Sequence, residues 1–192
     1  MSPRGLNIAD LVLAAFEETV MRQKLESKQY FSRMIDSPVG ALKLVASDAG
    51  LAAILWENED PRRVRLGHVT ERPDHPVLVE TERQLREYFA GKRQAFEVQL
   101  DFAGTPFQKK VWAALLTIPY GETRSYAQIA LQIGSPSAVR AVGAANGKNP
   151  ISIIAPCHRV IGSNGKLTGF AGGLGTKARL LALEAPALEG LR

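Results

Sequence analysis

Residues 125–147 read SYAQIALQIGSPSAVRAVGAANG and predict two short helices joined by a tight turn. The run Ser125-Tyr126-Ala127-Gln128 is a capping box, which starts a helix that ends at Gly134. Ser135-Pro136 predicts the cap of a second helix, which runs from Ser137 to about Asn146. Two short helices around a turn that contains glycine are a helix-turn-helix signature.

The second of these helices has an unusual outward face. Val139 and Val142 are expected to face the core, and the opposite stripe holds Ser137, Arg140, Gly143, Ala144 and Gly147. A helix that reads the major groove usually carries several long polar side chains on such a stripe. One arginine among small residues instead suits close approach to a nucleic-acid backbone or minor groove. The alternative is a small-residue face that packs on another helix.

The N-terminal half predicts short strands and one helix. Strands are expected at Tyr30–Ile35, Ala41–Ala46, Leu51–Trp56 and Phe96–Leu100. The first three form a small antiparallel sheet, because turn sequences at 37–40 and 47–50 join them. The polar stretch 58–74, which contains two prolines, reads as a loop, and 77–90 reads as a helix with an apolar side.

The sequence changes from strand-like to helix-like patterns near Gly104, which predicts a domain boundary. Thr105-Pro106-Phe107-Gln108 opens a helix, with threonine as the cap and proline in the first turn. The expected fold class is α+β, with a small N-terminal antiparallel sheet domain at 29–103 followed by a helical C-terminal domain with a helix-turn-helix at 104–192. Residues 1–28 are an N-terminal extension, which is a helix packed on the body, a frayed tail or an interaction segment.

Charge is distributed unevenly between the two halves. Residues 1–103 hold 14 Lys and Arg against 16 Asp and Glu, a net charge of −2, whereas residues 104–192 hold 10 against 3, a net charge of +7. A basic C-terminal half is what binding to nucleic-acid phosphates requires. The alternative is a basic surface with no partner.

The composition excludes several classes of protein. No apolar run approaches the roughly 18 residues of a membrane span, so no membrane partner is expected. The single cysteine, Cys157, rules out an intramolecular disulfide and fits a reducing cytoplasm. A structural zinc site usually takes four Cys or His ligands, which would use the single Cys and all three His of the chain, so no metal is expected.

The surroundings of Cys157 favour a reactive thiol. The apolar run 151–155 reads as a buried extended segment that ends in Pro156-Cys157-His158-Arg159. A lone cysteine is more often an inert buried hydrophobe, and a thiol with a pKa near about 8.5 needs a base to react at neutral pH. His158 is a candidate base, acting directly or through water, and Glu184 is a candidate to orient it. Adjacent side chains of an extended chain point apart, which favours the water bridge. Glu184 lies at the end of a predicted apolar C-terminal helix at 177–183, and the alternative for it is a solvated helix end.

The segment Ile154-Ala155-Pro156-Cys157-His158-Arg159-Val160-Ile161 resembles the active-site strand of O6-alkylguanine-DNA alkyltransferases, also called methylated-DNA–protein-cysteine methyltransferases. Further pieces lie in that family's order: Tyr120-Gly121-Glu122-Thr123 with Ser125-Tyr126, Arg140-Ala141-Val142-Gly143, Asn149-Pro150, and Gly169-Phe170-Ala171-Gly172-Gly173. The resemblance spans most of the chain from about Tyr30. It implies a ribonuclease-H-like N-terminal domain and a monomer that needs no cofactor.

The resemblance implies irreversible, single-turnover transfer of the alkyl group from O6-methylguanine, and also from O4-methylthymine, in double-stranded DNA to Cys157. Chemistry on a base inside a duplex requires that the base be flipped out. The implied catalytic residues are Cys157 as acceptor, His158 as base, Glu184 as its partner, Tyr126 as a hydroxyl near the flipped base, and Asn149, which shapes the turn below the cysteine. The implied DNA-binding residues are Arg140, as a finger entering the base stack, with Ser137, Gly143, Ala144 and Tyr126. The implied pocket residues are Pro150, Val160, Gly169, Phe170, Ala171 and Gly172.

The sequence departs from the family pattern in the pocket wall. Phe170 replaces a tyrosine of many members, and Ala171 replaces a serine of the human-type protein, so two possible hydroxyl groups are missing. Two other classes of protein remain open. One is a DNA-binding regulator in which Cys157 senses alkylation, and the other is a thiol hydrolase that uses Cys157 and His158.

Overall fold

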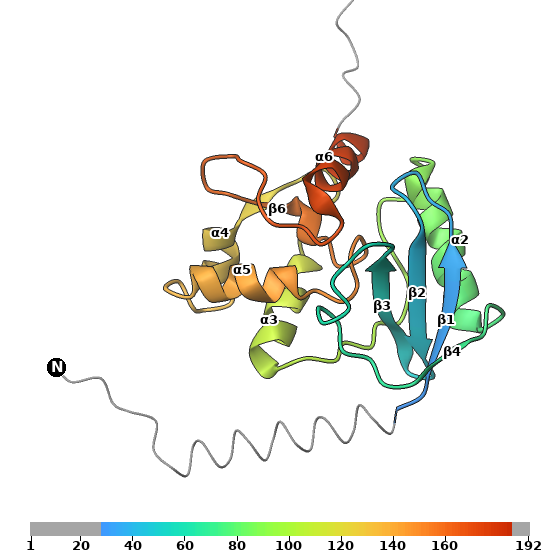
Figure 1. Ribbon diagram of the computed structural model, residues 1–192. Helices are drawn as coiled ribbons and strands as arrows, with labels where there is room; N and C mark the ends of the chain where they lie inside the picture. The colour runs from blue at the N-terminus through green and yellow to red at the C-terminus, as the bar shows by residue number, and fades with distance from the viewer. Residues whose placement is uncertain (1–27, 186–192) are drawn as a thin grey trace, which may run out of the picture.

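The computed structural model describes residues 28–185, so the expected N-terminal extension lies outside the described residues except for its last position. A β-sheet covered by one helix forms one side of the molecule, and a group of helices forms the other side (Figure 1). The expected α+β fold class is confirmed.

The sheet contains β1 (Tyr30–Ile35), β2 (Leu42–Ser47), β3 (Gly50–Trp56) and β4 (Val69–Glu71) in the order β3-β2-β1-β4. Strands β1, β2 and β3 pair antiparallel, as expected. The short strand β4 pairs parallel to β1, so the sheet is mixed, and the prediction of a loop throughout 58–74 was wrong here. Three residues are too few to show an alternating pattern, and their pairing depends on a strand far away in the sequence.

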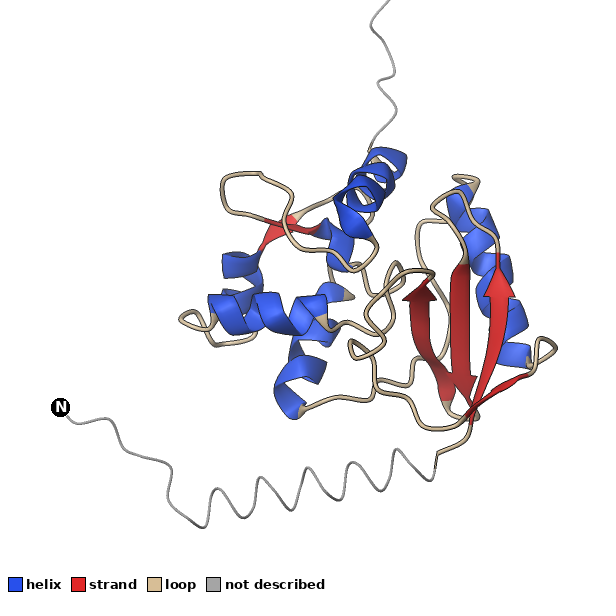
Figure 2. Cartoon of the chain, in the orientation of Figure 1, coloured by secondary structure: helices blue, strands red, loops and turns tan. Residues whose placement is uncertain are grey.

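Helix α2 (Pro76–Phe89) covers one face of the sheet (Figure 2). Its buried residues Leu78, Leu85 and Tyr88 join apolar side chains of the strands in the larger core. The expected strand at 96–100 was wrong, because only Leu100 pairs there, through an isolated parallel bridge to Leu51. Strand β3 is therefore an edge strand that receives single residues from later parts of the chain.

The helical side begins with α3 (Pro106–Leu115) and α4 (Tyr126–Gln132). Both expected capping boxes are confirmed: the side chains of Thr105 and Ser125 accept hydrogen bonds from the N–H groups three residues later. Helix α4 ends at Gln132, two residues before Gly134, whose φ of 72° allows a Schellman motif. Threonine and serine caps and the terminal glycine are local signals, which explains why the sequence reveals them.

Helix α5 (Val139–Gly147) starts two residues later than expected. Ala138 stands at its N-cap without a side-chain hydrogen bond, so the predicted cap by Ser135-Pro136 was wrong. Val142 is buried as predicted, but Val139 is 36% exposed and does not face the core. Helices α4 and α5 still pack on each other as a helix-turn-helix.

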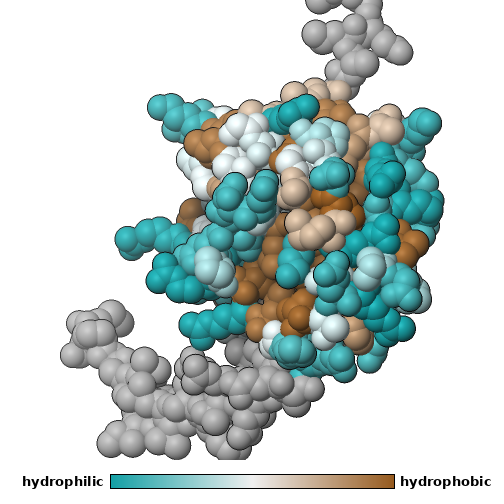
Figure 3. Space-filling model, turned by 45° about the vertical axis from the view of Figure 1, so that its right-hand side comes forward, coloured by the Kyte–Doolittle hydropathy of each residue, from teal (hydrophilic) through white to brown (hydrophobic). Residues whose placement is uncertain are grey.

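The chain closes with η1 (Cys157–Arg159), β6 (Val160–Ile161), which pairs parallel with β5 (Arg124–Ser125), and α6 (Gly173–Glu184). Helix α6 is longer than the predicted 177–183. Apolar surface gathers in the middle of one face, with hydrophilic side chains on both sides of it (Figure 3). Within residues 28–185, no helix has the length and apolar character needed to cross a membrane.

Candidate active site

The segment 151–155, which precedes the cysteine, is fully buried but not extended. The N–H of Ile154 donates to the carbonyl of Ser152 at 3.0 Å, and Ile153 between them has a φ of 74°. This is a γ-turn of the rare type with positive φ. A β-branched residue in this conformation costs on the order of 1–3 kcal/mol and persists only where the surroundings enforce it. The prediction of an extended segment was therefore wrong.

A second γ-turn leads directly into the cysteine. Pro156 has φ −80° and ψ 67°, and the N–H of Cys157 donates to the carbonyl of Ala155 at 2.8 Å. The Cys157–Arg159 segment then forms one turn of 3-10 helix. Two consecutive tight turns give the thiol a fixed position, although by a different backbone path from the stiff strand end that the sequence suggested.

Asn149 holds this double turn from inside. Its Nδ2 donates to the carbonyl of Ala155 at 2.8 Å, and its Oδ1 accepts the N–H of Ile151 at 3.1 Å. The guanidinium of Arg63 donates to the main-chain carbonyl of Asn149. Asn149 therefore lies where the sequence placed it, beneath the cysteine segment, and is completely buried.

Edge strand β3 holds the same turn from the sheet side. The N–H of Ile54 donates to the carbonyl of the buried Pro150 at 2.9 Å, and Ile54 pairs with Ile151 in a parallel bridge. The sheet half of the molecule thus supports the reactive segment of the helical half.

The Cys157 thiol is 3% exposed. Burial raises the pKa of this thiol, because the charged thiolate loses its hydration. The nearby Asn149 and Ser152 side chains and the positive charges of Arg63 and Lys177 act in the opposite direction. The balance leaves the pKa raised, so the thiol is protonated at neutral pH and needs a base to become a nucleophile.

His158 is completely buried, and its Nε2 lies 2.8 Å from Oε1 of Glu184. Burial lowers the pKa of His158, against the raising effect of Glu184, so the imidazole is neutral at neutral pH. Because an ionised carboxylate only accepts hydrogen bonds, the proton of the neutral ring is assigned to Nε2. Nδ1 is then an acceptor, and it has no protein partner within residues 28–185. Within the same residues no direct hydrogen bond joins it to Cys157, as expected, and the water bridge stays a prediction.

Glu184 accepts hydrogen bonds from four donor atoms. One donor is Nε2 of His158. Arg159 supplies two more, with Nε donating to Oε2 of Glu184 at 2.7 Å and Nη2 donating to Oε1 at 3.0 Å, and the hydroxyl of Tyr88 donates at 2.6 Å. Burial would raise the pKa of this carboxyl, but the hydrogen bonds from His158 and Arg159 prevail and lower it to about 2. Glu184 is 2% exposed, so the alternative of a solvated helix end was wrong.

Several residues of this site were not predicted from the sequence, because no motif around them indicates a role. They are Tyr88, Arg159, Ser152, Arg63 and Lys177. Lys177 is completely buried and donates to the carbonyls of Val160 and Thr168, the latter at 2.7 Å. For Lys177, the one hint was its place at the start of the apolar stretch 177–183. Lysine is rarely buried without partners, so a lysine there indicates a specific contact.

Tyr126 and the 168–172 loop form a second part of the site. The Tyr126 hydroxyl donates to the carbonyl of Thr168 at 3.2 Å, and a Cβ placed on either Gly143 or Gly169 would lie 3.9 Å from the Tyr126 side chain. The structure therefore brings predicted residues from α4, α5 and the loop next to one another.

Phe170 connects this loop to His158. Its ring lies edge-on to His158, with ring centres 6.4 Å apart, and edge-on to Trp56 of β3, with centres 5.4 Å apart. A Cβ on Gly172 would lie 2.8 Å from the Trp56 ring, so the loop and the tryptophan fit only with glycine there. Ala171 is half-buried between these two positions.

The predicted DNA-binding residues lie on the outer side of the helix-turn-helix. Ser137, Arg140 and Ala144 are exposed, and Gly143 is half-buried. Ser137 lies in the turn before α5 rather than in the helix. Within residues 28–185, Arg140 makes no ion pair and no side-chain hydrogen bond, so its side chain is available to a ligand. The same described part holds no group of three or more side chains placed to bind a metal ion.

Comparison with known protein families gives two matches that together cover almost all of the described residues. Residues 30–102 match the 6-O-methylguanine DNA methyltransferase, ribonuclease-like domain, and residues 106–186 match the 6-O-methylguanine DNA methyltransferase, DNA binding domain.

Individual relatives carry a consistent name. The methylated-DNA–protein-cysteine methyltransferase of Mycobacterium tuberculosis is 54% identical over 154 residues, which are 79% of this chain and 90% of the relative. The protein of that name from Methanosarcina acetivorans is 49% identical over 156 residues, 79% of this chain and 96% of the relative.

Solved structures agree with these matches. The M. tuberculosis protein OGT in complex with DNA is 51% identical and superimposes with a TM-score of 0.73, over 83% of this chain and 96% of that one. The O6-methylguanine-DNA methyltransferase of Pyrococcus kodakaraensis, at 22% identity and a TM-score of 0.57 over 81% of this chain and 98% of that one, shares the fold. The resemblance seen in the sequence is confirmed, and the chain belongs to the family of methylated-DNA–protein-cysteine methyltransferases, the O6-alkylguanine-DNA alkyltransferases.

Proposed function

We propose that this protein repairs alkylated DNA by moving an alkyl group from O6 of guanine to Sγ of Cys157, once per molecule. The observation that carries the proposal is the buried Cys157, held by two tight turns beside a neutral His158 that is fixed by Glu184. Its relatives are named for transfer to a protein cysteine, and one is solved in complex with DNA.

The proton of the thiol leaves first in this mechanism. Nδ1 of His158 accepts it through a bridging water, while Nε2 keeps its hydrogen bond to Glu184. The resulting positive imidazole is stabilised by the Glu184 carboxylate, which stays ionised because its pKa is about 2. The thiolate is favoured by the nearby Asn149 and Ser152 side chains and by the positive charges of Arg63 and Lys177.

The alkyl transfer is a displacement at an sp³ carbon. The thiolate forms the new S–C bond as the C–O6 bond breaks, and both electrons of that bond remain on guanine. A donor near the leaving guanine lowers the barrier, and the Tyr126 hydroxyl is the proposed donor. The thioether product is inert, and the chain has no second cysteine to resolve it, so each molecule reacts once.

The helix-turn-helix provides access to the base. Flipping guanine out of the duplex costs a few kcal/mol of unstacking. We assign Arg140 as the residue that fills the gap, and Ser137, Gly143 and Ala144 as the small residues that let α5 approach the DNA. Pro150, Val160 and residues 169–172 then surround the flipped base.

The remaining expectations are part of the same proposal. The sheet domain at 29–103 and the helical domain at 104–192 act together as a monomer in the cytoplasm, without cofactor or metal. O6-alkylguanine in double-stranded DNA is the preferred substrate, and O4-methylthymine is a second substrate.

Titration of protein against a methylated duplex tests the proposal. With EDTA present, the amount of repaired oligonucleotide should equal the amount of active protein and then stop increasing, and Cys157→Ser should repair none. Continued product formation beyond one equivalent would favour the thiol hydrolase instead. Binding of one operator sequence without repair would favour the regulator.

A further inference from the structure

A basic cavity of about 310 Å³ lies between the sheet side and the helical side, and none of Cys157, His158 and Glu184 lines it. One wall is the loop after β3, with Arg62, Arg63 and Arg65, and the other wall is the start of α3 together with Lys148, which follows α5. Four cationic residues and no acidic residue line the cavity. A concave site with excess positive charge favours an anionic ligand.

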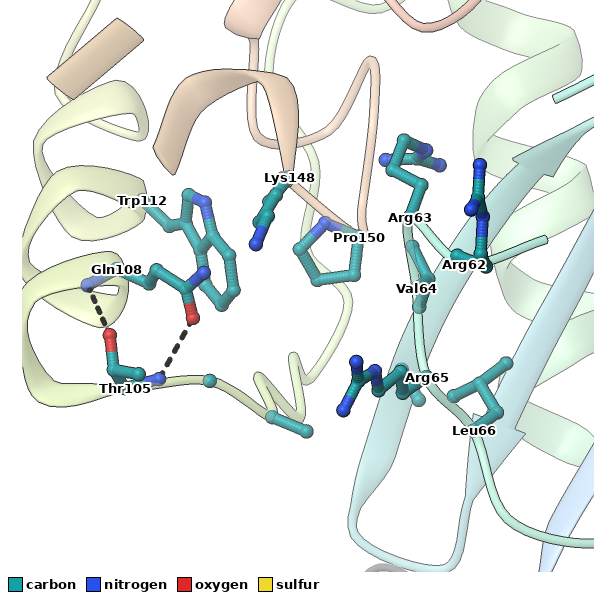
Figure 4. Close-up of a pocket in the computed structure, with 13 residues that line it drawn as sticks. Arg62, Arg63, Val64, Arg65, Leu66, Thr105, Gln108, Trp112, Lys148 and Pro150 are labelled. Atoms are coloured by element: carbon teal, nitrogen blue, oxygen red, sulfur yellow. Dashed lines mark hydrogen bonds between the residues drawn. The ribbon is translucent and has the colours of Figure 1, made fainter. Parts of the chain in front are cut away.

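The four cations have different surroundings. Arg62 is paired with Asp60 at 3.0 Å in open solvent, and Arg63 is paired with Glu59 at 2.6 Å. Arg65 and Lys148 form no ion pair within residues 28–185 and are exposed. In Figure 4, the Arg65 and Lys148 side chains extend from opposite walls toward the space between them, while Arg62 and Arg63 point away from it.

The start of helix α3 lies beside the same cavity. Thr105, Gln108 and Trp112 line the wall on the Lys148 side, and the partial positive charge of the nearby helix N-terminus adds to the positive charge around the space. Arg62 and Arg63 are held by their own carboxylates, so Arg65 and Lys148 are the two lining cations that remain for an anion.

We propose that this cavity is a phosphate site in which Arg65 and Lys148 hold the phosphate from opposite walls. A guanidinium matches the geometry of phosphate oxygens, and an ammonium adds a point charge. The phosphate comes either from the backbone of bound DNA or from free phosphate in solution. The first source rests on the function proposed above, and the second does not.

The position of Lys148 explains why DNA can supply the phosphate. Lys148 follows the last residue of α5, eight residues after Arg140. At 1.5 Å per helical residue, the cavity opening lies about 12 Å from Arg140 along the helix axis. Base pairs are spaced about 3.4 Å apart, so a duplex centred on Arg140 reaches Lys148 within three to four base pairs.

The test compares Arg65→Gln and Lys148→Gln with Arg62→Gln, a control in the same loop whose side chain points away. The affinity for an unmodified duplex is measured by fluorescence anisotropy at several salt concentrations. Loss of one phosphate contact should reduce the slope of log K against log[salt] by about 0.9 in each test variant and leave it unchanged in the control.

A second arm tests free phosphate. An NMR titration with inorganic phosphate at constant ionic strength follows the Arg65 Nε–H and the Trp112 indole N–H, which both belong to the cavity. Phosphate-dependent shifts that disappear in Lys148→Gln, without a change of slope on DNA, identify free phosphate as the ligand. Unchanged slopes together with no phosphate-dependent shifts overturn the proposal.

Alkyl transfer from free O6-benzylguanine to Arg65→Gln separates this proposal from the proposed function. The rate should equal that of the wild type, because Arg65 does not contact Cys157, His158 or Glu184. If wild-type protein fails to react while the slope still changes in Arg65→Gln, the phosphate site stands and the proposed function fails.

Discussion

The hydroxyl of Tyr88, on α2, donates a 2.6 Å hydrogen bond to Oε1 of Glu184, on α6. Both side chains are buried, and burial together with the Glu184 charge raises the pKa of Tyr88, so the hydroxyl keeps its proton. The sheet side of the molecule thus contributes directly to the hydrogen bonds of the carboxylate that holds His158. The two sides are joined by a contact within the candidate active site.

Removal of this hydroxyl should destabilise the protein. Tyr88→Phe leaves a buried carboxylate with one donor fewer, and hydrogen bonds to charged groups contribute about 1.5–3 kcal/mol. Tyr120→Phe is a matched control, because its hydroxyl donates to the neutral carbonyl of Leu183 at 3.1 Å. Urea unfolding should show a larger loss of unfolding free energy for Tyr88→Phe. An equal or smaller loss would mean that the contact is not energetically coupled to the Glu184 charge.

Glu184→Gln should weaken His158 as a base. The carboxylate raises the pKa of His158 against the effect of burial, so its loss lowers that pKa further and leaves the thiol harder to deprotonate. The rate of alkylation of Cys157 by a small electrophile should fall at neutral pH, and its rise with pH should shift to higher pH. Circular dichroism controls for folding. An identical pH–rate profile in a folded variant would show that Glu184 does not act through His158.

Gly172→Ala should disturb the pocket wall. Its Cβ would lie 2.8 Å from the rigid Trp56 ring, so the 169–172 loop has to move. We expect slower reaction with free O6-benzylguanine and little change in duplex binding. Gly175→Ala is the control, because a Cβ at that position meets nothing within 4 Å. Equal free-base rates for the two variants would remove Trp56 and Gly172 from the account of the pocket.

Arg140→Ala should slow duplex repair strongly and free-base reaction little. A residue that fills the gap left by a flipped base matters only where unstacking is required, and loss of a few kcal/mol there corresponds to roughly a ten- to thousandfold slower reaction. Arg140→Lys should restore the rate only in part, because lysine lacks the planar group that stacks on bases. Slowing of both reactions by the same factor would instead make Arg140 a structural residue.

The sequence revealed those parts of the structure that depend on local signals. The Thr105 and Ser125 capping boxes and the glycine end of α4 are each specified within four residues, and the structure has all three. The order of Cys157, His158 and Glu184 was recognisable because the family motif preserves it.

Features that depend on long-range contacts were not predictable. The apolar run 151–155 looks like a strand, but it contains a γ-turn at Ile153, and Asn149 from outside the run binds the backbone of both Ile151 and Ala155. Tyr88 looks like an ordinary core residue of an amphipathic helix, and nothing near it in the sequence indicates a charged partner 96 residues away.

The most direct test of the central claim is intact mass spectrometry of the protein after incubation with an O6-methylguanine duplex, followed by peptide mapping. The account predicts a mass increase of one methylene unit per chain, located entirely on the peptide that contains Cys157, and no increase in Cys157→Ser. An unmodified protein after complete repair of the oligonucleotide, or a methyl group on any other residue, would contradict it.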